Sequence, residues 1–140
     1  MEKVKKNVSI MCFHDELCLV YNALMTALSL LREGNSVDVF FGSRGINAVH
    51  KEKIKHLQCL PDQPPEAGEA VLRKMDEMNL PSAEDLMFFL IAEKARVWAC
   101  PLNKELFDIN AGDFYDGVKV ADPSTYYKDV VMKADMNLTF

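Results

Sequence analysis

The fold is decided by residues 8–41, VSIMCFHDELCLVYNALMTALSLLREGNSVDVFF. Residues 8–13 form a short run of nearly continuous apolar character, which is typical of a strand covered on both faces. Apolar side chains then recur at helical spacing over residues 15–33, which predicts a helix with a broad apolar face that ends at Gly34. Residues 36–41 form a second apolar run, so the segment predicts a right-handed strand–helix–strand crossover.

The remainder of the chain continues this alternation. Further helices are expected over residues 46–56, 66–78, 83–94, 101–107 and 123–133, and further strands over residues 96–100, 118–120 and 136–140. Ser82 and Asp85 have the spacing of a capping box at the start of one of these helices. The alternation predicts an α/β fold with a single doubly wound, mostly parallel five-stranded sheet, helices on both faces and the flavodoxin-like strand order 2-1-3-4-5.

Length and composition limit the function classes. A chain of 140 residues predicts one domain over residues 1–140, with a Pro-rich insertion at about residues 57–68. Hydrophobic residues are 49% and charged residues 26%, as in globular proteins, and the net charge is −5. Because no broad basic field is expected, we predict no nucleic-acid partner. The most apolar stretch, residues 17–31, is too short to span a bilayer, so no membrane insertion is expected.

The four cysteines, at positions 12, 18, 59 and 100, are irregularly spaced. A chain with this much apolar sequence needs no disulfides, so the cysteines predict free thiols and a cytoplasmic location. Cys12 and His14 form a Cys-x-His pair, but no second pair lies nearby in the sequence, and we predict no metal site. Dinucleotide and phosphate-loop motifs are missing, so no cofactor is predicted.

The assumed strand order places a ligand crevice at the carboxyl ends of the first and third strands. Cys100 ends the third strand and precedes a helix, and the free amide groups at a helix N-terminus favour a thiolate. A thiolate is the form that attacks a disulfide or persulfide sulfur, although a buried cysteine can equally serve as a small apolar side chain. The side chains expected to line the crevice are Cys12, His14, Ser43, Arg44, Gly45, Asn47 and Pro101.

Four stretches of sequence together carry a family resemblance. They are ALM at 23–25 before Gly34, VDVFF at 37–41 running into GIN at 45–47, LPSAEDL at 80–86 leading to VWAC at 97–100, and FYDGV at 114–118 with the terminal helix and strand. In these stretches, which cover most of the chain, the sequence resembles the DsrE/DsrF-like family of sulfur-relay proteins, especially its single-domain, peroxiredoxin-like branch. The most specific element is the Ala-Cys pair that ends the third strand.

The resemblance implies a doubly wound α/β fold assembled as trimers or hexamers. It also implies a cysteine, matching Cys100, that accepts sulfane sulfur as a persulfide and passes it on, with sulfur donor and acceptor proteins as partners. The sequence departs from the family in two places: Asp108-Ile109 stands where a Gly-Ile pair is common, and the insertion near residues 61–68 is shortened. Partner docking is therefore expected to differ.

Three functions remain open at this stage. The first is a sulfur carrier or sulfurtransferase that uses Cys100, with Arg44 and Lys104 as candidates for additional positive potential. The alternative is a non-catalytic oligomeric scaffold, or a module that binds a small molecule or a partner, in which Cys100 is packed. The third is thiol redox chemistry that pairs Cys12 with Cys100 in a disulfide, which requires Cα atoms within about 7 Å.

Overall fold

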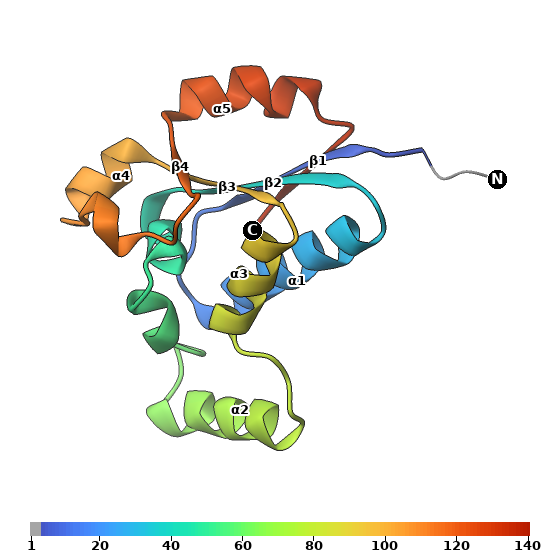
Figure 1. Cartoon of the computed structure of the whole chain (residues 1–140). Coiled ribbons are helices and arrows are strands. Elements are labelled where there is room, and N and C mark those ends of the chain that lie inside the picture. The colour runs from blue at the N-terminus through green and yellow to red at the C-terminus, as the bar shows by residue number, and fades with distance from the viewer. Residues whose placement is uncertain (1–3) are drawn as a thin grey trace.

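The computed structural model describes residues 4–140 and is built on a five-stranded sheet in which every strand pair is parallel (Figure 1). The strands are β1 (Asn7–Cys12), β2 (Ser36–Phe41), β3 (Arg96–Ala99), β4 (Lys119–Val120) and β5 (Met136–Thr139). The α-helices are α1 (Leu17–Arg32), α2 (Pro65–Glu77), α3 (Ala83–Ala92), α4 (Pro101–Leu106) and α5 (Pro123–Asp129). The predicted α/β class, with a parallel five-stranded sheet and helices on both faces, is confirmed.

The strand order is β4-β3-β2-β1-β5, so the expected order 2-1-3-4-5 is wrong. The chain advances one strand at a time from β1 to β4, and β5 returns to the other side of β1. Asp38 of β2 is in register with Arg96 of β3, and the two side chains form a bidentate ion pair. This pair favours β3 beside β2 rather than beside β1, a choice that the alternation of elements alone does not encode.

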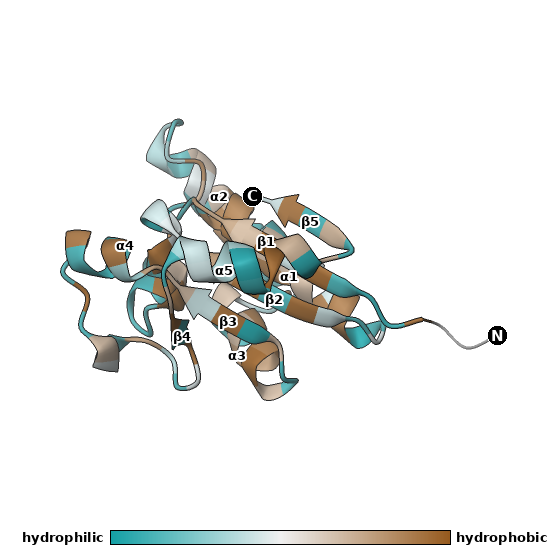
Figure 2. Ribbon diagram, turned by 90° about the horizontal axis from the view of Figure 1, so that it is seen from above, coloured by the Kyte–Doolittle hydropathy of each residue, from teal (hydrophilic) through white to brown (hydrophobic). Residues whose placement is uncertain are grey.

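The two faces of the sheet are covered differently. Helices α1 and α3 pack side by side on one face, and α5 with the short turn after it covers the other (Figure 1). Seen from above, α5 lies across the central strands and carries mostly hydrophilic residues (Figure 2). Because side chains alternate along a strand, each strand contributes to both faces.

The buried side chains form two separate clusters. The larger cluster contains Val8, Ile10, Val39 and Val97 of the strands with the apolar faces of α1 and α3. The smaller one, here called the α5-face cluster, consists of Met11, Phe40, Trp98, Cys100 and Tyr126. The sheet thus separates an aliphatic core from a small, largely aromatic one.

The helix starts agree only partly with the sequence. The capping box of α3 is confirmed: Ser82 Oγ accepts from Asp85 N at 3.0 Å, and Asp85 Oδ2 accepts from Ser82 N at 2.9 Å. Helix α1 has Glu16 at its N-cap and no side-chain cap. Its first amide, Leu17 N, donates to the carbonyl oxygen of Gln58 at 2.8 Å, so a neighbouring loop supplies the acceptor.

The segment between β2 and α3 lies partly outside the sheet layers. The helix expected over residues 46–56 is two 3₁₀ turns, Ser43–Val49 and Lys53–His56. Helix α2 follows as an outlying element (Figure 1), and Gly68 is its buried residue. A Cβ on Gly68 would lie 2.2 Å from the carbonyl oxygen of Cys59, so glycine is required for α2 to approach the preceding loop. Within residues 4–140, no helix has both the length and the apolar character needed to cross a membrane.

Candidate functional site

The carboxyl edge of the central strands holds the residues predicted to form a site, but not in the predicted arrangement. Strand β2 lies between β1 and β3, so the crevice expected between the first and third strands is not formed. The backbone shows this directly, because Cys100 N donates to the carbonyl oxygen of Phe41, at the end of β2, at 3.2 Å. The topological switch point of this sheet lies between β1 and β5 instead.

Cys100 lies at the N-cap of α4, directly after β3, and its residue is 3% exposed. It belongs to the α5-face cluster. Four partly buried apolar residues complete the cover of this cluster: Phe13, Ala121, Val130 and Val131. The position is the one predicted from the sequence, whereas the burial is that of a packed side chain.

Cys12 lies on the other face of the sheet, in the larger core, and is fully buried. Its Sγ donates to the carbonyl oxygen of His14 at 3.5 Å. Burial raises the pKa of the Cys12 thiol to about 11, which disfavours a thiolate at neutral pH. Since Cys12 and Cys100 lie on opposite faces with β2 between their strands, the geometry gives no support to a disulfide between them.

A groove of about 520 Å³ opens beside the start of α1 and contains two of the predicted lining residues, Arg44 and Asn47. Both contact Asp15: Asn47 Nδ2 donates to Oδ2 at 3.0 Å, and Arg44 Nε lies 3.8 Å from Oδ1. Among the described residues, the buried Oδ1 of Asn47 has no hydrogen-bond partner. The remaining lining residues are Glu16, Glu52, Lys53, His56, Leu57, Gln58 and Pro61. Both charge signs therefore line this groove, which suits a polar small molecule.

The other predicted lining residues lie outside this groove. Ser43 N donates to Asn103 Oδ1 at 2.7 Å, which links the loop after β2 to α4. Gly45 packs against the end of β1, where a Cβ would lie 2.3 Å from the carbonyl oxygen of Cys12. His14 is exposed, and Pro101 is the first residue of α4. The structure thus brings Arg44 and Asn47 together and leaves Cys100 apart from them.

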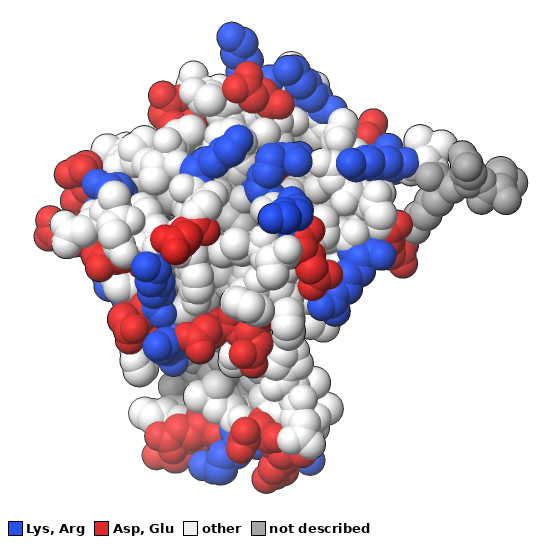
Figure 3. Space-filling model, in the orientation of Figure 1, with Lys and Arg blue, Asp and Glu red and all other residues white. Residues whose placement is uncertain are grey.

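The surface charges on the face drawn in Figure 3 and the potential metal ligands among residues 4–140 do not indicate a further site. On the face drawn in Figure 3, basic and acidic side chains are interspersed, and no continuous basic surface is present there. Across residues 4–140, no group of three or more His, Cys, Asp or Glu side chains is placed to hold a metal ion.

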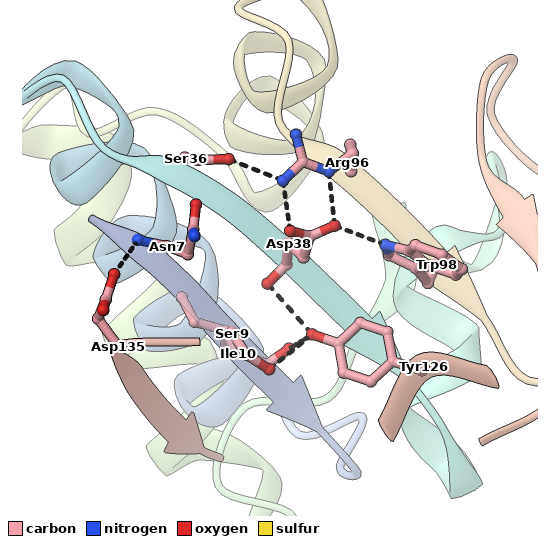
Figure 4. A network of polar contacts seen from close by, with 9 residues as sticks. All are labelled: Asn7, Ser9, Ile10, Ser36, Asp38, Arg96, Trp98, Tyr126 and Asp135. Carbon is pink, nitrogen blue, oxygen red and sulfur yellow. Dashed lines mark hydrogen bonds and ion pairs between the residues drawn. The ribbon is translucent and has the colours of Figure 1, made fainter. Parts of the chain in front are cut away.

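A buried polar network beneath α5 was missed from the sequence (Figure 4). The Asp38 carboxylate accepts from Arg96 Nε and Nη2 at 2.7 and 2.6 Å and from Trp98 Nε1 at 2.9 Å. The Tyr126 hydroxyl contacts Ser9 Oγ at 2.8 Å and donates towards the backbone oxygen of Ile10 at 3.3 Å. The signal for this network was a single charged residue, Asp38, in the middle of an apolar strand.

A second feature that the sequence did not reveal is the contact between Cys18 of α1 and Cys59 of the loop before α2. The two thiols are 41 residues apart in the chain, and no motif connects them. All four cysteines are free thiols in this structure.

The chain is similar to a known protein family in sequence and to solved structures in fold. A family model described as the DsrE/DsrF/DrsH-like family matches residues 63–139, which include Cys100, α4 and α5. The crystal structure of the ychN protein from E. coli is similar with a TM-score of 0.67 and 18% sequence identity, covering 98% of this chain and 100% of that one. The structure of MTH1491, a protein of unknown function from Methanobacterium thermoautotrophicum, is similar with a TM-score of 0.62 and 12% sequence identity. The match covers 96% of this chain and 99% of that one. These two likenesses establish the fold alone. No curated protein matches the sequence.

Proposed function

The chain belongs to the DsrE/DsrF/DrsH-like family, and on that premise we propose that it is a sulfur carrier that holds sulfane sulfur as a persulfide on Cys100. The observation that carries the proposal is the position of this thiol. Cys100 occupies the N-cap of α4 at the carboxyl end of β3, within the segment that the family model matches. The sequence resemblance implies a sulfur-relay role and assigns the accepting cysteine to this position.

The proposed transfer is neutral in oxidation overall. The Cys100 thiolate attacks the outer sulfur of a donor persulfide, a new S–S bond forms at Cys100, and the S–S bond of the donor breaks. The donor leaves as a thiolate and takes up the proton released by Cys100. In the second half, an acceptor thiolate attacks the same outer sulfur, and Cys100 leaves as a thiolate. Cys100 is the N-cap residue of α4, and its side chain makes no capping hydrogen bond to that helix.

Burial sets a condition on this chemistry. Because Cys100 is only 3% exposed, a donor reaches its Sγ only when part of the α5-face cluster opens. The residues that would move are those that cover the cluster from outside, Phe13, Val130 and Val131. Sulfur loading is therefore expected to be slow in the isolated chain and faster when a partner displaces this cover.

Intact-protein mass spectrometry after incubation with inorganic polysulfide tests the proposal. The wild-type chain is expected to gain one sulfur atom at a time, and Cys100→Ser to lose the adduct that peptide mapping assigns to residue 100. Cys18→Ser is the matched control, since it removes a partly exposed thiol and should keep the adduct on Cys100. A folded wild-type chain without sulfur on Cys100, even after partial opening in low urea, overturns the proposal.

A second candidate function rests on a different observation, the groove beside α1. Its polar lining and the burial of Cys100 favour a non-catalytic module that binds a small polar molecule. Ligand-observed NMR with a set of small carboxylates and amides is the test. Binding that Arg44→Ala and Asn47→Ala both abolish supports this function, and binding that neither variant alters places the ligand elsewhere and rejects it.

We also propose that the chain assembles as a homo-oligomer, a trimer or hexamer as the resemblance implies. The support is the exposure of large apolar side chains on α4, where Leu102 is 63% and Leu106 68% exposed. Light scattering coupled to size exclusion is expected to give a mass above 15.9 kDa that falls on replacing both residues by lysine. A monomeric wild-type chain at micromolar concentration rejects this proposal.

A further inference from the structure

Cys18 and Cys59 form a close pair of thiols away from Cys100. Their Sγ atoms are 3.7 Å apart. A disulfide needs about 2.0 Å between the sulfur atoms, so the two thiols must approach by about 1.7 Å to bond. Neither thiol takes part in the function proposed above.

The backbone around the pair is held in register on both sides. Leu17 N, one residue before Cys18, donates to the carbonyl oxygen of Gln58, one residue before Cys59, at 2.8 Å. On the far side, Gly68 of α2 lies directly against the carbonyl oxygen of Cys59. The start of α1, the loop and the start of α2 thus meet at the two sulfur atoms, and the contact is fixed by the fold rather than by the side chains alone.

The two thiols differ in access. Cys18 is partly exposed, whereas Cys59 is 8% exposed and is one of the residues that line a groove of about 460 Å³ beside α2. A reagent therefore meets Cys18 first, and Cys59 lies where it can react with whatever has bonded to Cys18. This order of access is the arrangement of an attacking thiol with a resolving thiol behind it.

We propose that Cys18 and Cys59 form a thiol–disulfide exchange site whose substrates are low-molecular-weight disulfides. The Cys18 thiolate attacks one sulfur of the substrate, a mixed disulfide forms, and one substrate half leaves as a thiolate. The Cys59 thiolate then attacks Cys18 Sγ, the mixed disulfide breaks, and the second half leaves. The protein loses two hydrogen atoms, the two leaving thiolates take up the two protons, and the substrate is reduced by two electrons.

The surroundings bear on the rate and on the product. Burial and the proximity of Cys59 raise the pKa of Cys18 to about 11. The thiol is therefore protonated at rest, and exchange is expected to speed up in alkaline buffer. The neighbouring Glu16 carboxylate further disfavours the Cys18 thiolate, so the disulfide is expected to persist once it has formed.

Oxidised glutathione is the probe for this site, and intact mass with peptide mapping is the readout. The wild-type chain is expected to lose two hydrogen atoms and to yield a peptide that links Cys18 with Cys59. Cys59→Ser should stop at one glutathionyl group on Cys18, and Cys18→Ser should form neither product. Cys100→Ser, which lacks the proposed sulfur-carrying thiol, should still yield the peptide that links Cys18 with Cys59, and the folding of each variant is checked by circular dichroism.

Two results overturn the inference: a wild-type mass that stays unchanged in excess oxidised glutathione at alkaline pH, or a linked peptide that contains Cys12 or Cys100. The Cys18→Ser/Cys59→Ser double variant separates this site from the sulfur carrier. It should still load sulfur on Cys100 if the carrier function holds, and it should never form the linked peptide.

Discussion

The two faces of the sheet are held by different means. On the α1–α3 face, two helices bury a broad set of aliphatic side chains against the strands. On the other face, α5 is the main cover, and its single buried residue is Tyr126, held by ring contacts with Phe40 and Trp98 and by the polar network below it. The first face depends on buried area and the second on a few directed contacts.

This difference matters because Cys100 belongs to the thinner face. A face that depends on one aromatic residue and its hydrogen bonds can open locally while the rest of the fold stays intact. We therefore expect the α1–α3 face to stay closed in the folded protein and the α5 face to open locally, which gives reagents access to Cys100. Each of the following changes tests that expectation, in order of expected effect on stability.

Tyr126→Ala is expected to have the largest effect. Tyr126 is fully buried, and removal of such an aromatic side chain is expected to lower the free energy of unfolding by about 4 kcal/mol. Urea titration measures this loss. The same change should increase the rate at which Cys100 reacts with an alkylating reagent under native conditions, because it leaves a cavity in the α5-face cluster to which Cys100 belongs.

The matched control for this change is Leu24→Ala, which removes a fully buried side chain of α1 from the opposite face. It should lower stability by about 3 kcal/mol and leave alkylation of Cys100 slow. Equal acceleration in both variants would mean that labelling follows global unfolding, and the contrast between the faces would be lost.

Asp38→Asn is expected to cost about 2 kcal/mol, because it removes the charge that pairs with Arg96 and weakens the contact with Trp98. The cost stays below that of a fully buried pair, since the Arg96 side chain is 45% exposed. Urea unfolding gives the magnitude, and hydrogen exchange of α5 amides should rise more than that of α1 amides. Uniform exchange in both helices would contradict a local role.

Alkaline pH should act on the α1–α3 face through Cys12. Burial raises the pKa of this thiol to about 11, so the folded chain prefers the protonated form more strongly than the unfolded chain does. The resulting stability is complete below about pH 9 and is lost as the pH rises through 11. A series of urea titrations from pH 7 to 11 should show this decline, and Cys12→Ala should reduce its slope. An unchanged slope would assign the decline to other groups.

Glu93→Gln is expected to have the smallest effect. Glu93 forms a bidentate pair with Arg32 across α1 and α3, at 2.8 and 2.9 Å, but both side chains are exposed. Such surface pairs contribute little, so the urea midpoint should not change measurably, and raising the salt concentration should change it equally little in wild type and variant. A clear loss would mean that directed contacts also govern the α1–α3 face.

Much of the fold could be predicted from the sequence because its signals are local. Apolar runs such as residues 8–12 and 36–41, and the Ser82 capping box, each act within a few residues. The strand order could not be predicted, since it is expressed in contacts between distant residues, such as Asp38 and Arg96, which are 58 residues apart.

The position of Cys100 between a strand and a helix could be predicted from the sequence, but the residues that surround its side chain could not. That Cys100 follows β3 and precedes α4 is a local property. Whether its side chain meets Arg44 and Asn47 or lies under α5 depends on strand alternation and on which face each helix takes, and both require the assembled sheet. The Cys18–Cys59 contact is likewise a product of the loop that meets the start of α1.

The pairing of β1 with β5 has a consequence for the order of folding. Ser9 and Tyr126 are separated by 117 residues, and Asn7 N donates to Asp135 across 128 residues. Contacts with such large sequence separation form late, because a long loop must close before they contribute. During synthesis, β1, α1 and β2 can pair while α5 and β5 are still unmade, so the nascent sheet carries one uncovered face and one open edge.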